Sequence, residues 1–187
     1  MLHVRSNDSE NLFDTDFGVP VRKEACVLGV QLSANLSWDA HVEKVCRKAG
    51  KGLHILRLLR YHLTSSDLHT VYNAVVRSVM EYCSPAFVKL NAKLSRRLQL
   101  VDNRAHRIIY GEERKCSCTR DVLATRREQI ARKQMQRLLL DPEHNLSSRL
   151  PVRLAYSNRL NNFYCRTDIR KNSFFPYVTL LLNGASM

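Results

Sequence analysis

The sequence predicts a mainly α-helical fold: a small helical bundle with a short extended segment near its N-terminal end and a loosely ordered C-terminal tail. Apolar residues recur at spacings of three and four along four stretches, which is the period of a buried helix face. Residues typical of helix ends flank these stretches. We expect residues 1–24 to form a polar, disordered lead-in, residues 25–141 a helical domain and residues 142–187 a partly ordered tail.

The bundle is expected to centre on a helix over residues 63–84. Thr64 is a suitable N-cap, and Asp67 completes a capping box. A nearly continuous apolar surface follows, formed by Leu68, Val71, Tyr72, Val75, Val76, Val79, Met80, Tyr82 and Cys83. Pro85 ends the helix because it disfavours helical dihedral angles at the preceding residue. A helix this apolar needs cover on most sides, so we expect it to be the most buried element.

Two elements precede this central helix. Residues 25–32 (ACVLGVQL) form an apolar run that predicts a buried strand or extended segment. Ser37 is expected to cap a second helix, with Asp39 in its first turn. The core face of that helix comprises Val42, Val45, Ala49, Gly52, Leu53, Ile55, Leu56, Leu58, Leu59 and Leu63. The short connection to the central helix predicts an antiparallel pair.

Two more helices are expected after Pro85. The first, over residues 93–110, ends at Gly111, and its core face comprises Leu94, Leu98, Val101, Ala105 and Ile108. Thr125 and Glu128 predict a capping box that opens the second, over residues 126–140. Its core face comprises Ile130, Met135, Leu138 and Leu139. In the tail, apolar residues 174–175 and 178–182 can dock on the core.

Positive charge is concentrated on these last two helices. The chain has 30 Lys and Arg against 17 Asp and Glu, a net charge of +13 and a pI near 9.8. Such an excess favours a polyanionic partner, most often nucleic acid. The candidate phosphate-binding residues are Arg96, Arg97, Arg104, Arg107, Arg126, Arg127, Arg132 and Lys133. The alternative is that these side chains only solvate the outer faces of the helices.

No pattern predicts catalysis or a cofactor. Two-metal polymerases need paired carboxylates, and this chain has no Asp-Asp dipeptide. Cys116, Cys118 and Cys165 lack the matched pairs of a zinc site, so free thiols are favoured over zinc. The sequence shows neither a signal peptide nor a membrane-spanning run. We therefore expect an intracellular chain, in the nucleus or the cytoplasm, with no membrane or small-molecule partner.

Four motifs follow one another along the chain. They are Val-Leu-Gly-Val at 27–30 with Leu-Ser-Trp at 36–38 and His41, residues 72–85 ending in Glu-Tyr-Cys-Ser-Pro, residues 98–111 with Asn-Arg-Ala at 103–105, and Asn-Ser-Phe-Phe-Pro at 172–176 with Leu182 and Asn183. In this order they resemble the reverse transcriptases of non-LTR retrotransposons, of LINE type and close to the jockey-like elements. The resemblance covers approximately residues 21–183.

The resemblance implies the thumb-like C-terminal part of such a polymerase, which follows the catalytic palm. The family's catalytic Tyr-x-Asp-Asp motif lies upstream of the matching region, so no catalytic residue is carried over and no activity is expected from this chain alone. In the family, the thumb holds the template–primer duplex mainly by its backbone. Three alternatives stay open: a detached nucleic-acid-binding or general helical interaction module, a piece of a longer polymerase, and a decayed mobile-element remnant without selected function.

Overall fold

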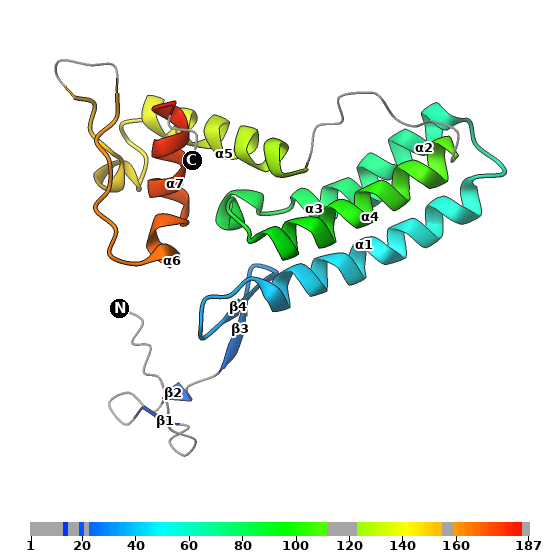
Figure 1. Ribbon diagram of the computed structural model, residues 1–187, viewed down its shortest axis with the longest axis horizontal. Coiled ribbons are helices and arrows are strands. Elements are labelled where there is room, and N and C mark those ends of the chain that lie inside the picture. Colours follow the sequence, from blue (N-terminus) through cyan, green and yellow to red (C-terminus); the bar gives the residue numbers. More distant parts are fainter. Residues whose placement is uncertain (1–12, 15–18, 21–22, 112–122, 155–158, 185–187) are drawn as a thin grey trace.

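Helices account for most of the computed structural model, which describes residues 13–14, 19–20, 23–111, 123–154 and 159–184 (Figure 1). Two short antiparallel strand pairs come first: β1 (Phe13–Asp14) with β2 (Val19–Pro20), and β3 (Glu24–Val27) with β4 (Val30–Ser33). The helices that follow are α1 (Asp39–Leu59), α2 (Ser65–Tyr72), the π-helix η1 (Asn73–Arg77), α3 (Ser78–Glu81), the 3-10 turn η2 (Ser84–Phe87), α4 (Ala92–Tyr110), α5 (Leu123–Leu140), the 3-10 turn η3 (Ser147–Arg149), α6 (Asp168–Lys171) and α7 (Phe174–Leu182). The predicted fold class is confirmed.

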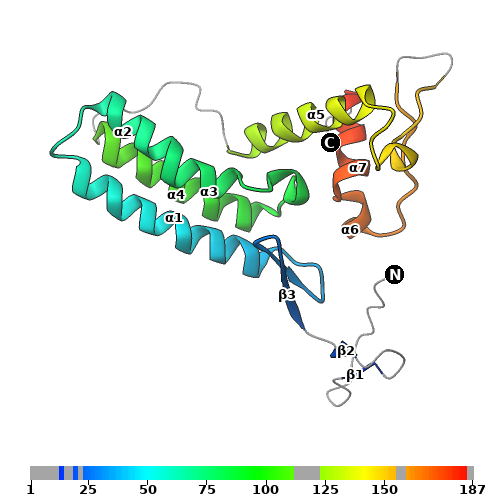
Figure 2. The ribbon, with the colours of Figure 1, turned by 180° about the vertical axis from the view of Figure 1, so that it is seen from behind.

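Three long elements form the larger of two hydrophobic clusters. Helices α1 and α4 run in the same direction, and the continuous segment α2–η1–α3 runs antiparallel to both (Figures 1 and 2). The first cluster comprises Val42, Val45, Ala49, Leu53, Leu56, Leu68, Tyr72, Val76, Met80, Phe87, Leu90, Leu94, Leu98, Val101, Ala105, Ile108, Ile109 and Leu123. The predicted antiparallel pairing of α1 with the central helix is confirmed.

The second cluster joins the tail to α5. It comprises Val88, Ala131, Met135, Tyr177, Val178 and Leu181. The predicted docking of the apolar tail residues is thus confirmed, with α7 packed on α5 and on the η2 turn. Asn183, which follows α7, holds the preceding segment in place: its Oδ1 accepts from the Leu160 backbone N–H at 2.9 Å, and its Nδ2 donates to the Leu160 carbonyl, also at 2.9 Å.

The apolar run before α1 is a hairpin and not a buried strand. Leu28 (φ 48°) and Gly29 (φ 83°) occupy the two positions of its turn, where left-handed dihedral angles match the twist of the flanking strands. All four residues of β3 are exposed, and only Val30 of β4 is buried. The prediction of burial was wrong because β4 packs against α1, whereas β3 pairs only with β4 and stays exposed.

The central helix differs from the prediction in its buried face and in its end. Thr64 caps it as predicted, accepting a hydrogen bond from the Asp67 backbone N–H. Its buried residues recur every four positions, at Leu68, Tyr72, Val76 and Met80. The π-helical segment explains this spacing, because its hydrogen bonds span five residues and each turn therefore holds more residues than an α-helical turn.

The same helix ends at Glu81, three residues earlier than predicted. Cys83 takes a left-handed conformation (φ 56°), and Tyr82 and Cys83 are exposed instead of buried. The expectation that this is the most buried element is also wrong, since every residue of α7 is at least partly buried while much of α2 is exposed. Helix α7 lies between α5 and η2, whereas α2 lies at the far end of the bundle.

Candidate nucleic-acid interface

Helix α4 carries four of the eight predicted phosphate-binding residues. It begins where the Asn91 side chain accepts a hydrogen bond from the Leu94 backbone N–H at 2.8 Å and ends at Gly111, as predicted. At 3.6 residues per turn, its exposed arginines form two rows about 80° apart around the helix. One row contains Arg96 and Arg107, and the other contains Arg97 and Arg104.

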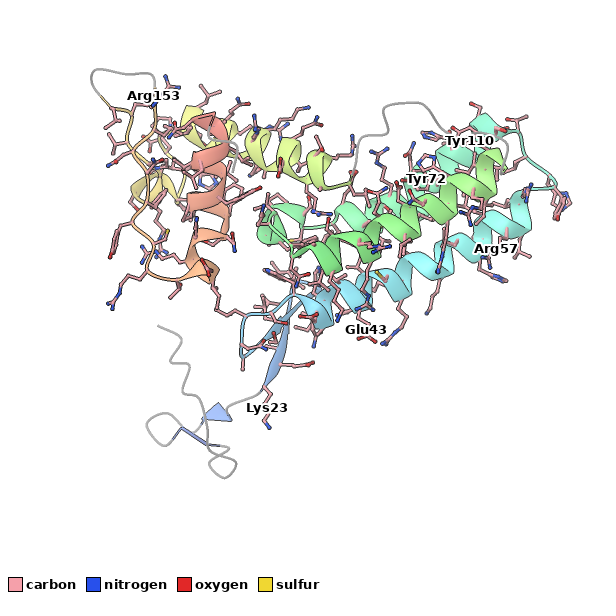
Figure 3. The ribbon with its side chains drawn as sticks, in the orientation of Figure 1. Lys23, Glu43, Arg57, Tyr72, Tyr110 and Arg153 are labelled. Carbon is pink, nitrogen blue, oxygen red and sulfur yellow. The ribbon has the colours of Figure 1, made fainter. Side chains whose placement is uncertain are left out.

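The acidic residue of α4 is withdrawn from this exposed side. Asp102 is 2 % exposed and faces the central helix, where its Oδ1 accepts a hydrogen bond from the hydroxyl of Tyr72. Tyr72 is labelled in Figure 3. Among the described residues, no carboxylate forms an ion pair with any of the four α4 arginines. The exposed side of α4 is therefore positively charged along its whole length.

The row formed by Arg97 and Arg104 lies beside α1. Burial is the main cause that raises the pKa of the Cys46 thiol on α1, and the Glu43 carboxylate raises this pKa further. The Arg97 guanidinium acts in the opposite direction and lowers it, so Arg97 lies close to this part of α1. Glu43 is itself paired with Arg47 one turn later, with 3.2 Å between the carboxylate and guanidinium atoms. The α4 arginines are thus divided between a row next to α1 and a row away from it.

The α5 residues of the predicted site separate into exposed and structural groups. Arg132 and Lys133 are exposed as predicted. Arg126 forms an ion pair with Glu81 of α3, and Arg77 donates to the same carboxylate at 2.8 Å. This cluster of three side chains joins α5 to the central helix, so Arg126 has a structural partner already.

Arg127 was predicted on the outer face of α5, and this prediction is wrong. Its side chain is 3 % exposed, its Nη2 donates to the Ser95 hydroxyl at 3.1 Å, and its Nε has no partner within the described residues. Burial lowers the pKa of this guanidinium. Arg127 lies four, eight and eleven residues before Ala131, Met135 and Leu138, so it shares the buried face of α5 with them.

A buried polar network that the sequence analysis did not identify fixes α4 between its neighbours. Gln99 Nε2 donates to Asp102 Oδ2 at 3.0 Å, and Gln99 Oε1 accepts from the Leu123 backbone N–H at 3.1 Å. His106 Nε2 lies 3.7 Å from Asp102 Oδ1. Burial, followed by the hydrogen bond to Asp102, raises the pKa of Tyr72 well above its usual value. The sequence did contain an indication of this network, because Gln99 and Asp102 are two polar residues three positions apart at the buried side of α4.

Replacing Arg127 by Met is expected to leave the free energy of unfolding unchanged or to raise it by about 1–3 kcal/mol. A buried cation with one neutral hydrogen-bond partner has a large desolvation penalty, and an apolar side chain of similar length removes it. Urea denaturation followed by circular dichroism measures this change. Arg132→Met, an exposed replacement on the same helix, is the control. A loss of several kcal/mol for Arg127→Met would contradict this account of the residue.

Other kinds of site find little support in the described part of the chain. No group of three or more His, Cys, Asp or Glu side chains there is arranged to hold a metal ion. Cys165 is a free, partly buried thiol, whereas Cys116 and Cys118 lie outside the described residues. Residues 1–12 of the predicted lead-in also lie outside them. No described helix has both the length and the apolar character needed to cross a membrane.

Comparisons with known proteins do not add to these observations. No family model, no curated protein and no solved structure matches the chain.

Proposed function

We propose that this chain binds the sugar-phosphate backbone of nucleic acid, without sequence preference, through the exposed arginines of α4. We further propose that it does so as the thumb-like part of a reverse transcriptase of the non-LTR type that its motifs resemble. The observation that supports binding is the one-sided charge of α4. Five basic side chains lie on its exposed side, and its acidic residue is buried. These basic residues are Lys93, Arg96, Arg97, Arg104 and Arg107.

The chemistry of these side chains fits a phosphate partner. A guanidinium presents a planar fork of N–H donors that matches two phosphate oxygens. A rigid helix holds such groups at fixed positions, which is sufficient for contact with a backbone and gives no information about base sequence. Arg132 and Lys133 of α5 are exposed and form a second, smaller basic group in this proposal.

The proposal predicts a salt dependence that originates in α4. Each phosphate contact releases counterions, so replacing the four α4 arginines by Gln is expected to lower the slope of log Kd against log salt by about 3. Gln has nearly the helix propensity of Arg, so α4 stays folded. Fluorescence anisotropy of a labelled duplex, titrated at several salt concentrations, measures the slope.

A variant with the same charge change elsewhere separates a contact surface from net charge. It replaces four exposed arginines of the C-terminal segment by Gln: Arg149, Arg159, Arg166 and Arg170. We expect this variant to keep most of the wild-type slope. Equal slopes for the two variants would mean that only total charge matters, and no binding by the wild-type chain would refute the proposed function.

A further inference from the structure

Helix α1 contains two glycines, and packing explains only one of them. A Cβ atom at Gly52 would lie 2.8 Å from Val76 Cγ2 and 2.9 Å from the Val75 carbonyl oxygen, so this position must stay small. A Cβ atom at Gly50 would meet no atom within 4 Å. Glycine is unfavourable inside a helix, yet at Gly50 nothing in the described structure requires it. One reason for an exposed glycine is the close approach of a ligand to the backbone.

Gly50 lies on the flank of α1 that meets α4. Cys46, Gly50 and Arg57 are spaced by four and seven residues, which places them in one stripe along α1. The Arg97 charge acts on Cys46 at the start of this stripe. We define the α1–α4 seam as the surface formed by this stripe together with Arg97 and Arg104 of α4.

The arginines of the seam lie on both sides of Gly50 along the helix axes. Helices α1 and α4 run in the same direction (Figures 1 and 2), and each rises about 1.5 Å per residue. Arg104 therefore lies about 10 Å further along the seam than Arg97, and Arg57 lies near the C-terminal end of α1 (Figure 3). Along the seam, Gly50 thus presents no side chain, and arginine residues occur before and after it in the direction of the helix axes.

One carboxylate lies at the start of the seam. Glu43 acts on the same Cys46 thiol as Arg97, but it is paired with Arg47 at 3.2 Å. Its charge is thereby largely offset, and the remainder of the seam, from Gly50 to Arg57, contains no acidic residue. A polyanion laid along the seam would meet attraction over most of its length.

We infer that the backbone of one nucleic-acid strand lies along the α1–α4 seam and comes closest to the protein at Gly50. This inference rests on the proposed function and extends it to α1, which supplies a second line of contacts. It assigns Arg97 and Arg104 to the bound strand and places Arg96 and Arg107 at its margin. It also assigns to Gly50 the role of admitting a sugar-phosphate group that any side chain would hold away.

The test compares two glutamates on the same helix. Gly50→Glu introduces a carboxylate into the seam, whereas Ile55→Glu introduces one at a position that is 42 % exposed and about 140° around the helix from Gly50. We expect Gly50→Glu to weaken the binding of labelled oligo-dT and of a labelled duplex about tenfold at low salt, and Ile55→Glu to weaken it less than about threefold. Thermal melting of each variant verifies that it is folded.

Two further measurements make the result decisive. Gly50→Gln adds bulk without charge and is also expected to weaken binding, whereas bound oligonucleotide should slow the alkylation of Cys46 relative to the exposed Cys26 and Cys83. Wild-type affinity for both Gly50→Glu and Gly50→Gln would overturn the inference, as would equal losses for Gly50→Glu and Ile55→Glu. If either result occurred while the four-arginine variant of α4 still lost binding, the proposed function would stand and only the seam would be refuted.

Discussion

Val76→Asp is expected to unfold the first hydrophobic cluster. Val76 is 0 % exposed and lies where the π-helical segment meets α1, next to Gly52. A carboxylate there would be buried among the apolar side chains of the first cluster, and burying a charge without a partner costs several kcal/mol. The expected loss exceeds about 4 kcal/mol, which is a large part of the stability of a small domain. Far-ultraviolet circular dichroism at rising temperature measures it.

Val75→Asp is the matched control for this experiment. Val75 is adjacent in sequence but only partly buried, so its carboxylate can reach water and the expected loss is smaller. The pair of variants tests the buried face directly, since a regular α-helix with the predicted face would place Val75 inward. A larger loss for Val75→Asp than for Val76→Asp would contradict the π-helical register of the structure.

Gly52→Ala is expected to be the most damaging change of a single methyl group in α1. The added Cβ would lie 2.9 Å from the Val75 carbonyl oxygen, and a backbone atom cannot move aside as a flexible side chain can. The two helices must separate locally, so we expect a loss of about 1–3 kcal/mol. Urea denaturation, with attention to an unchanged m value, measures the loss.

The same substitution at the nearby Gly50 is expected to change the free energy of unfolding in the opposite direction. Gly50→Ala meets no atom within 4 Å and gains helix propensity, so it is expected to raise the free energy of unfolding by up to about 1 kcal/mol. The same chemical change two residues apart thus has opposite signs. If both variants lost stability equally, the close approach of α1 and the central helix at Gly52 would not be the cause.

Much of the fold could be predicted because its main signals are local. The apolar spacing in α1 identified Val42, Val45, Ala49 and Leu56 as core residues, and all four are buried. The caps at Thr64 and Gly111 were also recognised, since each depends on residues close in sequence. Ile55 and Leu58 of α1 were assigned to the core but are exposed, because none of the elements that the structure describes covers that side of the helix.

The errors concern features that depend on contacts distant in sequence. The start of α5 is fixed by Gln99, which accepts a hydrogen bond from the Leu123 backbone N–H across 24 positions. A local capping pattern at Thr125 could not reveal this start. The inward position of Arg127 instead follows from its spacing of four and eight residues from the buried Ala131 and Met135. The π-helical register likewise depends on packing against α1 and has no recognised residue pattern.

The part of the candidate site on α4 could be predicted from the sequence, whereas the part on α1 could not. The arginines of α4 are exposed as expected, because they alternate with a clear apolar face. The contribution of α1 requires knowing which flank of α1 meets α4, and the spacing of its own residues does not contain that information. The significance of Gly50 likewise appears only when Gly52, two residues later, is seen to have a packing reason of its own.

The turn at η2 connects the two hydrophobic clusters through consecutive residues. Phe87 belongs to the first cluster and Val88 to the second. Pro85 and the left-handed Cys83 restrict the backbone just before them. The position of the α5–α7 pair on the three-helix bundle therefore depends on this stiff turn, together with the contacts of α5 to Glu81, Ser95 and Gln99. A substitution in this turn can reorient α5, and with it Arg132 and Lys133, relative to the arginines of α4 while the composition of both cores stays the same.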